Sequence, residues 1–222
     1  MIEELQISIG IASYNQQEYL CDAIDSALSQ TIPCEIVVCN DGSTDNSLEI
    51  AKSYPVKVID QVNKGLASAR NTIIMNATGR YIVFLDSDDI LLDNCVEKMI
   101  EVIKQTDADI ISPSFRTFGT SNETIILMDN PKLEDFKLGN RLPYFCAVKR
   151  EALLEVGGYS PRMTWGAEDL HLWINLLTRG KTVATIKEPL VLYRTKENSM
   201  WTETRNHEKE FLAQIEKDFP LW

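Results

Sequence analysis

A short acidic sequence directly follows the most apolar stretch of this chain. Residues 81–85 are apolar and lead into Asp-Ser-Asp-Asp at 86–89. The apolar run is typical of a strand buried on both faces of a parallel sheet, and open α/β sheets bind ligands beyond the carboxyl ends of such strands. Because Asp86 and Asp88 are two residues apart, we expect an extended chain to point both the same way, where they suit Mg²⁺ or Mn²⁺ with a phosphate. A solvated acidic turn is the alternative.

The elements that position these carboxylates are predicted from hydrophobic periodicity in residues 1–112. Apolar runs favour strands at 7–12, 35–39, 56–59, 81–85 and 108–112. Helical spacing favours helices at 20–28, 45–53, 65–77 and 96–103. Repeated strand–helix units of this length predict an α/β fold, with a mainly parallel sheet flanked by helices and right-handed crossovers.

The pattern of residues 113–222 is less regular. Residues 113–141 are polar with one β-like run at 124–128, which predicts an excursion over the edge of the sheet. The later elements are expected as a strand at 142–148, helices at 151–155 and 167–178, a strand at 183–193 and an amphipathic C-terminal helix at 203–219. Without repeats or linkers, we interpret 1–222 as one domain, with a ligand-binding half at 1–112 and a smaller mixed half at 113–222.

Polar residues end several of the predicted strands. They comprise Ser-Tyr-Asn at 13–15, Asn-Asp-Gly-Ser at 40–43 and the acidic sequence at 86–89, with Asn63 to Asn71 between them. Parallel strands bring their carboxyl ends to one edge, which predicts a single polar crevice. No Gly-x-Gly-x-x-Gly follows the first strand and no Walker loop occurs, so a dinucleotide or P-loop nucleotide is not expected.

Composition restricts the partners and the compartment. The 222 residues are 44% hydrophobic and carry a net charge of −11, which disfavours nucleic-acid partners. No apolar run approaches the ~20 residues of a membrane span. Five cysteines without a Cys-x-x-Cys motif favour a cytoplasmic protein with buried thiols at Cys21, Cys39 and Cys146. Peripheral attachment to a membrane through a partner is compatible with this interpretation.

Taken together, these motifs resemble the inverting GT-A glycosyltransferases of family two, in the family's order and over most of the chain. Residues 9–15, Ile-Gly-Ile-Ala-Ser-Tyr-Asn, resemble its first strand, and Val-Val-Cys-Asn-Asp-Gly-Ser-Thr-Asp at 37–45 resembles its nucleotide-contacting strand end. Gly65 to Asn71 is similar to its next signature, and Phe-Leu-Asp-Ser-Asp-Asp at 84–89 to its DXD segment. Trp-Gly-Ala-Glu-Asp-Leu at 165–170 resembles its catalytic acidic pair.

The resemblance implies a GT-A fold and an enzyme that moves a sugar from a nucleoside-diphosphate sugar to a hydroxyl acceptor, with inversion and a divalent cation. Asp41 would contact the base; a carboxylate suits the imide N–H of uracil, so UDP is favoured, with dTDP and GDP open. Asp88 would bind Mn²⁺ or Mg²⁺ directly, and Asp86 would lie near the ribose or share the metal. The other implied donor-binding residues are Ala12, Tyr14, Asn15, Lys64, Gly65, Arg70 and Ser87. A turn residue at Asp41 and solvated helix-start cations at Lys64 and Arg70 are the alternatives.

The same resemblance makes Asp169 the general base, with Glu168 orienting the acceptor or sharing the role. Two acids that cap a helix and suit its dipole, worth up to ~1 kcal/mol, are the alternative. One departure concerns Lys196, which stands where many relatives have a histidine that helps bind the metal or the diphosphate. A protonated lysine is a poor metal ligand but offsets phosphate charge. We therefore hypothesise that Arg194 and Lys196 close over the leaving group and weaken the metal dependence, a solvated loop being the alternative.

Other functions and partners stay open from the sequence. A sugar nucleotidyltransferase shares the carboxylates but would need a Gly-rich basic loop after the first strand, and a non-catalytic nucleotide or glycan binder is a further alternative. The acceptor is expected to be a glycan, lipid-linked glycan or protein hydroxyl in cell-surface glycan or polysaccharide synthesis, and a homo-oligomer is compatible with the C-terminal helix. Trp165 and Trp201 could stack on acceptor sugars, with core or interface aromatics as the alternative. His171 is expected to be a packed or partly exposed helix residue.

Overall fold

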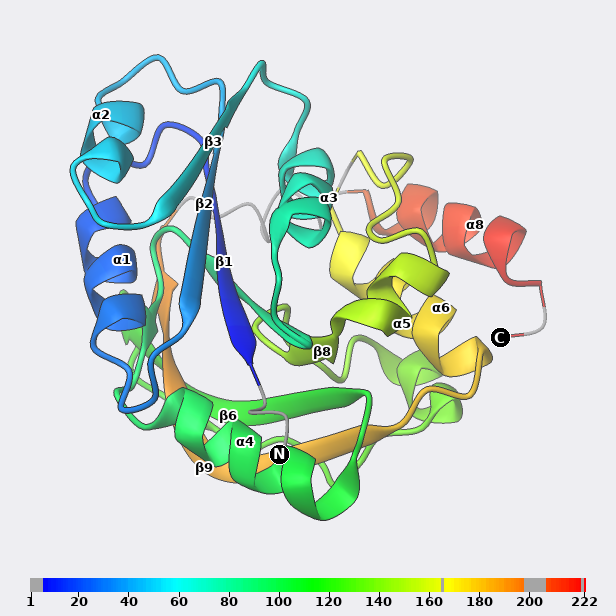
Figure 1. Cartoon of the computed structure of the whole chain (residues 1–222). Helices are drawn as coiled ribbons and strands as arrows, with labels where there is room; N and C mark the ends of the chain where they lie inside the picture. Colours follow the sequence, from blue (N-terminus) through cyan, green and yellow to red (C-terminus); the bar gives the residue numbers. More distant parts are fainter. Residues whose placement is uncertain (1–5, 165, 198–206, 221) are drawn as a thin grey trace.

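The computed structural model describes residues 6–164, 166–197, 207–220 and 222 (Figure 1). Within these residues one nine-stranded sheet has the order β3-β2-β1-β4-β8-β6-β9-β5, with β7 paired to β6. The strands are β1 (Ile7–Ser13), β2 (Glu35–Asp41), β3 (Lys57–Gln61), β4 (Tyr81–Asp86), β5 (Ile90–Leu91), β6 (Ile110–Gly119), β7 (Thr124–Ile125), β8 (Ala147–Lys149) and β9 (Val183–Thr195).

Helices connect these strands and cover both faces of the sheet. They are α1 (Leu20–Leu28), α2 (Ser47–Lys52), α3 (Leu66–Asn76), α4 (Cys95–Thr106), α5 (Arg150–Glu155), α6 (Glu168–Thr178), α8 (Glu208–Asp218) and the 3₁₀ helix η1 (Leu133–Leu138). Figure 1 shows α1 and α2 on one side of β1 and β2, and α3 on the other. In the described helices, no segment is both long and apolar enough to cross a bilayer.

Strands β3, β2, β1 and β4 are parallel, as the alternating pattern predicted. Their register pairs Ala12 with Cys39 on one side and with Asp86 on the other. The strand ends that carry the polar residues are therefore level with one another. The second half is mixed, because β8 is antiparallel to β4 and β6 whereas β9 is parallel to β6.

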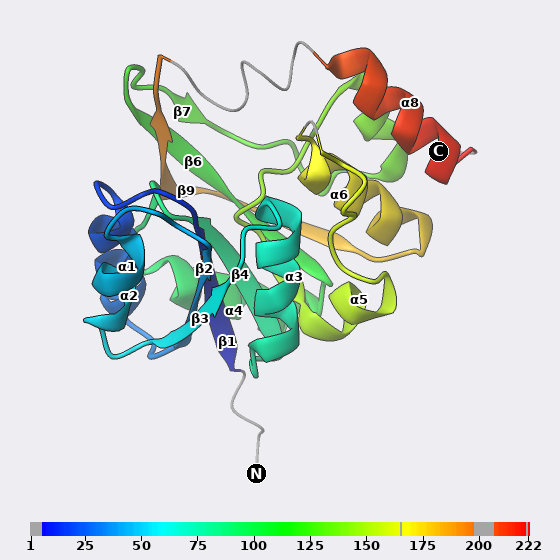
Figure 2. The ribbon, with the colours of Figure 1, turned by 90° about the horizontal axis from the view of Figure 1, so that it is seen from above.

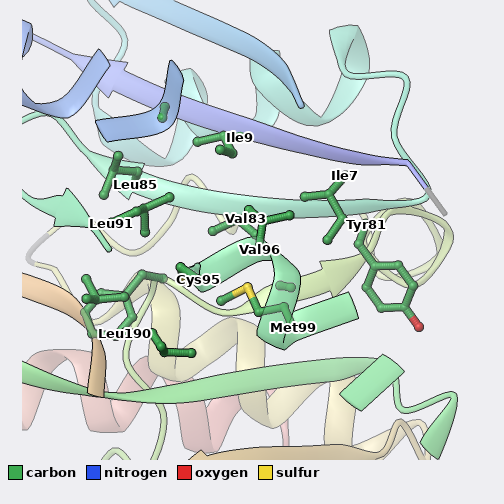
Figure 3. Packing of buried hydrophobic residues seen from close by; sticks show 14 of the residues in the cluster. Ile7, Ile9, Tyr81, Val83, Leu85, Leu91, Cys95, Val96, Met99 and Leu190 are labelled. Carbon is green, nitrogen blue, oxygen red and sulfur yellow. The ribbon is translucent and has the colours of Figure 1, made fainter. Parts of the chain in front are cut away.

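Strand β4 is buried on both faces, which confirms the interpretation of its apolar run. Tyr81, Val83 and Leu85 pack in one core with α1, α2 and α4 (Figure 3). The alternate residues Ile82 and Phe84 pack in a second core with α3, α5, α6 and α8. This two-sided burial fixes the position of the acidic sequence that follows.

Several predicted strands differ in extent from those observed, β6 and β8 among them. Strand β6 continues through residues assigned to an irregular excursion, because a register shift at Pro113/Ser114 lets the pairing with β9 pass the proline. Strand β8 is shorter than the strand predicted at 142–148 and holds only three residues, Ala147–Lys149. Phe145 and Cys146, which the prediction included, are buried in a loop. Helix α8 begins at Glu208 and lies beside α6 (Figures 1 and 2); its predicted start at Glu203 lies outside the described residues.

Candidate active site

A cavity of about 530 Å³ opens at the carboxyl ends of β1, β2 and β4, and we call it the donor cavity. The predicted residues that line it are Ala12, Tyr14, Asp41, Gly65, Asp86, Ser87, Asp88, Arg194 and Lys196. The polar crevice expected from the strand ends is therefore present. Asn63, from the segment assigned to the crevice, lines it too, and among the described residues that line it but were not predicted are Gln16 and Tyr193.

Three other predicted donor residues lie outside this lining. Asn15 connects the loop after β1 with the loop after β2. Its side-chain oxygen accepts from the N–H of Thr44, and its own N–H donates to Ser43. Lys64 is exposed at the loop before α3. Arg70 is buried, which excludes the alternative of a solvated helix-start cation for this residue.

Asp41 organises the loop that leads into α3. Its Oδ1 accepts from Nε2 of Gln61 at 2.7 Å and from the N–H of Lys64 at 3.0 Å, and its Oδ2 accepts from the N–H of Gly65 at 2.8 Å. Gly65 has φ +85°, a conformation that L side chains rarely adopt. The Asp41 carboxylate therefore stabilises this loop, as expected if Asp41 is a turn residue. It also lines the donor cavity.

The acidic sequence turns as soon as β4 ends. The strand stops at Asp86, and residues 87–88 form a turn, so the expectation that Asp86 and Asp88 share one face of an extended strand is wrong. Both nevertheless reach the donor cavity, and each has a different cationic partner. Asp86 Oδ1 is 2.7 Å from Nη2 of Arg70, and Asp88 Oδ2 is 2.7 Å from Nζ of Lys196.

The third carboxylate, Asp89, is buried and connects this turn to neighbouring segments through hydrogen bonds. It accepts from the hydroxyl of Tyr144 and, at 2.7 Å, from the N–H of Arg194. Burial, followed by the charges of Asp88 and Asp86, raises the pKa of Asp89 well above its usual range. Burial also raises the pKa of Asp86, although the positive charge of Arg70 opposes that shift.

A second cavity of about 490 Å³ adjoins the donor cavity, and we call it the acceptor-side cavity. Leu66, Asp86 and Tyr193 line both cavities. The wall of the second cavity includes Asp169 and Glu168 together with residues of η1 and α8. The predicted catalytic pair thus lines the acceptor-side cavity and not the donor cavity, and the two cavities meet at the three residues that they share.

Asp169 is held at the start of α6 with its carboxylate oriented by two donors. Ala167, directly before the helix, has φ +58°, and Asp169 Oδ1 accepts from the N–H of Leu170 at 2.7 Å. Oδ2 accepts from Nδ2 of Asn140 at 2.8 Å. Burial, then the neighbouring charge of Glu168, raises the pKa of Asp169 to about 7. A carboxylate with this pKa can take up a proton near neutral pH.

Glu168 is turned toward a different partner from the one expected. It is buried, and its Oε1 lies 2.7 Å from Nη1 of Arg70. Arg70 therefore bridges Glu168 and Asp86. Sequence reasoning missed Asn140, which lies in the irregular segment 113–141, and Tyr144, which was assigned to the predicted strand at 142–148 without a role. It also gave Asp89 no role apart from Asp86 and Asp88.

The donor cavity offers a divalent ion two carboxylate oxygens as ligands. Oδ2 of Asp86 and Oδ1 of Asp88 have no hydrogen-bonding or ionic partner among the described residues. Mg²⁺ commonly uses one or two carboxylates and completes its shell with substrate phosphates and water. Within the described residues, no group of three or more His, Cys, Asp or Glu side chains is arranged to hold a metal by itself.

The remaining predicted residues have mixed outcomes. His171 is buried in α6 beside Phe219, with Nε2 3.0 Å from Asp218, which confirms it as a packed helix residue. Cys39 and Cys146 are buried as expected, whereas Cys21 is only half-buried. Trp165 and Trp201 lie outside the described residues.

Comparisons with known proteins point to one family. A family model described as "Glycosyl transferase family 2" matches residues 8–164. The chain is 30% identical to "Glycosyltransferase GlyG" of Streptococcus pneumoniae over 87% of this chain and 72% of that protein. It is 28% identical to "Putative teichuronic acid biosynthesis glycosyltransferase TuaG" of Bacillus subtilis over 87% of this chain and 81% of that one.

The fold is also similar to that of a solved structure. TarS of S. aureus in complex with UDP-GlcNAc has a TM-score of 0.78 at 20% identity, covering 89% of this chain and 60% of that chain. This similarity confirms the predicted α/β fold of the GT-A type. Among three of the curated relatives that it matches, the chain spans between 18% and 72% of their length.

Proposed function

Because this chain belongs to glycosyl transferase family 2, we propose that it transfers one sugar from a nucleoside-diphosphate sugar to a hydroxyl group of an acceptor. The observation that carries the proposal is the pair of adjoining cavities. One contains the acidic turn at 86–89, and the other contains Asp169 with its pKa raised to about 7. Such an arrangement would hold a donor and an acceptor in neighbouring cavities, with the transfer taking place where the two cavities meet.

The donor is proposed to be a UDP-sugar. TarS, which shares the fold, has been solved with UDP and with UDP-GlcNAc. Asp41 adds a chemical reason, since a carboxylate has about four acceptor sites and, in the part of the chain that the structure describes, three N–H groups use them. The remaining site, on Oδ2, suits the imide N–H of uracil, which cytosine lacks.

Asp169 is proposed as the general base that removes the proton from the acceptor hydroxyl. The hydrogen bonds from Asn140 and from the N–H of Leu170 orient its two oxygens. A base with a pKa near the working pH is efficient because it is partly ionised and still basic. Attack from this side, with the diphosphate leaving through the donor cavity, would invert the configuration at the transferred carbon.

Asp86 and Asp88 are proposed to hold Mg²⁺ or Mn²⁺ together with the phosphates of the donor. When bound, such an ion would neutralise the charge that develops on the departing diphosphate. Glu168 and Arg70 would support this centre from within the protein. Arg70 fixes Asp86, and the charge of Glu168 keeps the pKa of Asp169 high.

The acceptor is proposed to be a glycan in the synthesis of a cell-surface polysaccharide. The name of TuaG, a relative that this chain matches over 87% of its length, refers to teichuronic acid. The acceptor-side cavity combines Asp169 with the apolar residues Phe136, Phe211, Leu212 and Trp222. Aromatic rings beside carboxylates suit sugar rings, which have apolar faces and polar edges.

The proposal is tested by nucleotide binding and by product analysis. We expect UDP to raise the melting temperature more than dTDP, GDP or CDP; saturation at about 100 times Kd stabilises a protein by about 2.7 kcal/mol. UDP should be released from a UDP-sugar in the presence of an oligosaccharide acceptor, and proton NMR should show the inverted anomer. Formation of pyrophosphate from UTP and a sugar phosphate would instead identify a nucleotidyltransferase and overturn the proposal.

A further inference from the structure

The donor cavity contains a cation that belongs to the chain itself. Nζ of Lys196 lies 2.7 Å from Oδ2 of Asp88, and both residues line the cavity. We propose that Lys196 is the resident counter-ion of Asp88 and contacts the donor diphosphate, so that Lys196 and a divalent ion are alternatives at this carboxylate. This inference rests on the proposed nucleotide-sugar function.

The ammonium group is positioned by a ring as well as by a carboxylate. Nζ of Lys196 lies 4.1 Å from the centroid of the Tyr19 ring, within the range of a cation–π interaction. An ammonium has three N–H donors, and the ion pair with Asp88 uses one of them. The others remain available for phosphate oxygens that enter the cavity.

The chain that carries Lys196 is tied to the same turn as Asp88. The N–H of Arg194 donates to Asp89 at 2.7 Å, and its Nε donates to the carbonyl of Asp88 at 2.8 Å. Its guanidinium lies over the ring of Phe118 at 4.3 Å. Arg194 therefore holds the end of β9 against the acidic turn, and two residues later Lys196 reaches the carboxylate. This division of tasks differs from the hypothesis that both cations close over the leaving group.

Charge balance explains why the two cations exclude each other. An unpaired Asp88 would repel a diphosphate, and the ammonium removes that repulsion before the donor arrives. A divalent ion on the same carboxylate would face the ammonium at short range and be repelled. While Lys196 stays paired with Oδ2 of Asp88, the ion therefore binds this carboxylate only weakly through Oδ1. As a consequence, the donor should bind without metal, and the metal should add little to its affinity.

Isothermal titration of UDP in EDTA and in Mn²⁺ tests this inference on the purified chain and its variants. We expect the affinity of the wild-type chain for UDP to change less than about 3-fold between the two conditions. Lys196→Met should lose about 10-fold in EDTA, the scale of one charged contact, and recover much of it in Mn²⁺. Electron paramagnetic resonance without nucleotide should show that Lys196→Met binds Mn²⁺ more tightly than the wild type.

The matched control is Lys187→Met. Lys187 lies on β9, the strand that ends directly before Lys196, and forms an ion pair of 2.8 Å with Asp129. It is not among the residues that line the donor cavity, so UDP binding should not change. Melting curves check that each variant folds, with Lys196→Gln as the substitute if Lys196→Met does not. The inference is overturned if wild-type binding requires Mn²⁺ and Lys196→Met behaves like the wild type, a result that leaves the donor proposal intact. Absence of UDP binding in both conditions would overturn both.

Discussion

Arg70 and Glu168 stand 98 positions apart in the sequence, yet Nη1 of Arg70 lies 2.7 Å from Oε1 of Glu168. The other end of the same guanidinium pairs with Asp86, and the rings of Tyr144 and Tyr159 lie 4.9 and 5.2 Å from it. One buried cation thus connects the wall of the donor cavity with the first turn of α6, where Asp169 is placed. The two halves of the candidate active site are joined through this residue.

We predict that Arg70→Met destabilises the fold by about 3–5 kcal/mol, because it leaves the buried Glu168 and the half-buried Asp86 without their counter-charge. Urea denaturation followed by circular dichroism measures the change. Arg80→Met is the control, since Arg80 and its partner Asp107 are largely exposed and such pairs contribute about 0–1 kcal/mol. Similar losses in the two variants would show that the buried bridge has no special importance.

We predict that Asp41→Ala destabilises the fold by about 2–3 kcal/mol and weakens UDP binding. The substitution removes the acceptor for the side chain of Gln61 and for the N–H groups of Lys64 and Gly65, and buried donors without partners are costly. Asp93→Ala provides the comparison, because Asp93 is exposed. If Asp41→Ala has wild-type stability and wild-type UDP affinity, Asp41 neither stabilises this loop nor binds the nucleotide.

The pH dependence of turnover follows from the pKa of Asp169. A general base acts in its ionised form, so kcat should rise as the pH increases through about 7 and level off above it. The hydrogen bond from Asn140 favours the ionised form, which means that Asn140→Ala should move the midpoint to higher pH.

The pH–rate profile of the two proteins, from about pH 5 to about pH 9, makes this measurement. Asn122→Ala serves as the control, because Asn122 is exposed and is not among the residues that line either cavity. A profile without a step near neutral pH, or a midpoint that falls in Asn140→Ala, would be inconsistent with Asp169 as the base.

The parts of the site that sequence reasoning could predict are those that the sheet imposes. Asp41 and Asp86 stand at the ends of apolar parallel strands, and parallel strands place such ends at one edge whatever the loops do. The same reasoning predicted the parallel half of the sheet. It misjudged Asp88, because the period of two holds only while the chain stays extended, and the turn begins immediately after Asp86.

Other features depend on tertiary contacts that leave no periodic signal. Asn140 contacts Asp169, which lies 29 positions later in the sequence, and a single asparagine in a polar segment resembles an ordinary turn residue. Arg70 was expected to face solvent or the donor, since nothing in its own helix indicates the pairing with Glu168. Strand β6 was predicted to end at Ser112 because polar and turn-forming residues follow, but it continues to Gly119 with a bulge beside Pro113.

The most direct test of the proposed function separates donor binding from catalysis with Asp169→Asn, which keeps the shape of the side chain and removes its charge. We predict that kcat falls by about 10²-fold or more, while the affinity for UDP stays within about 3-fold of the wild type. Asp129→Asn, at a largely exposed aspartate, should leave both values unchanged. A folded Asp169→Asn variant with near-normal turnover would contradict the assignment of Asp169 as the base.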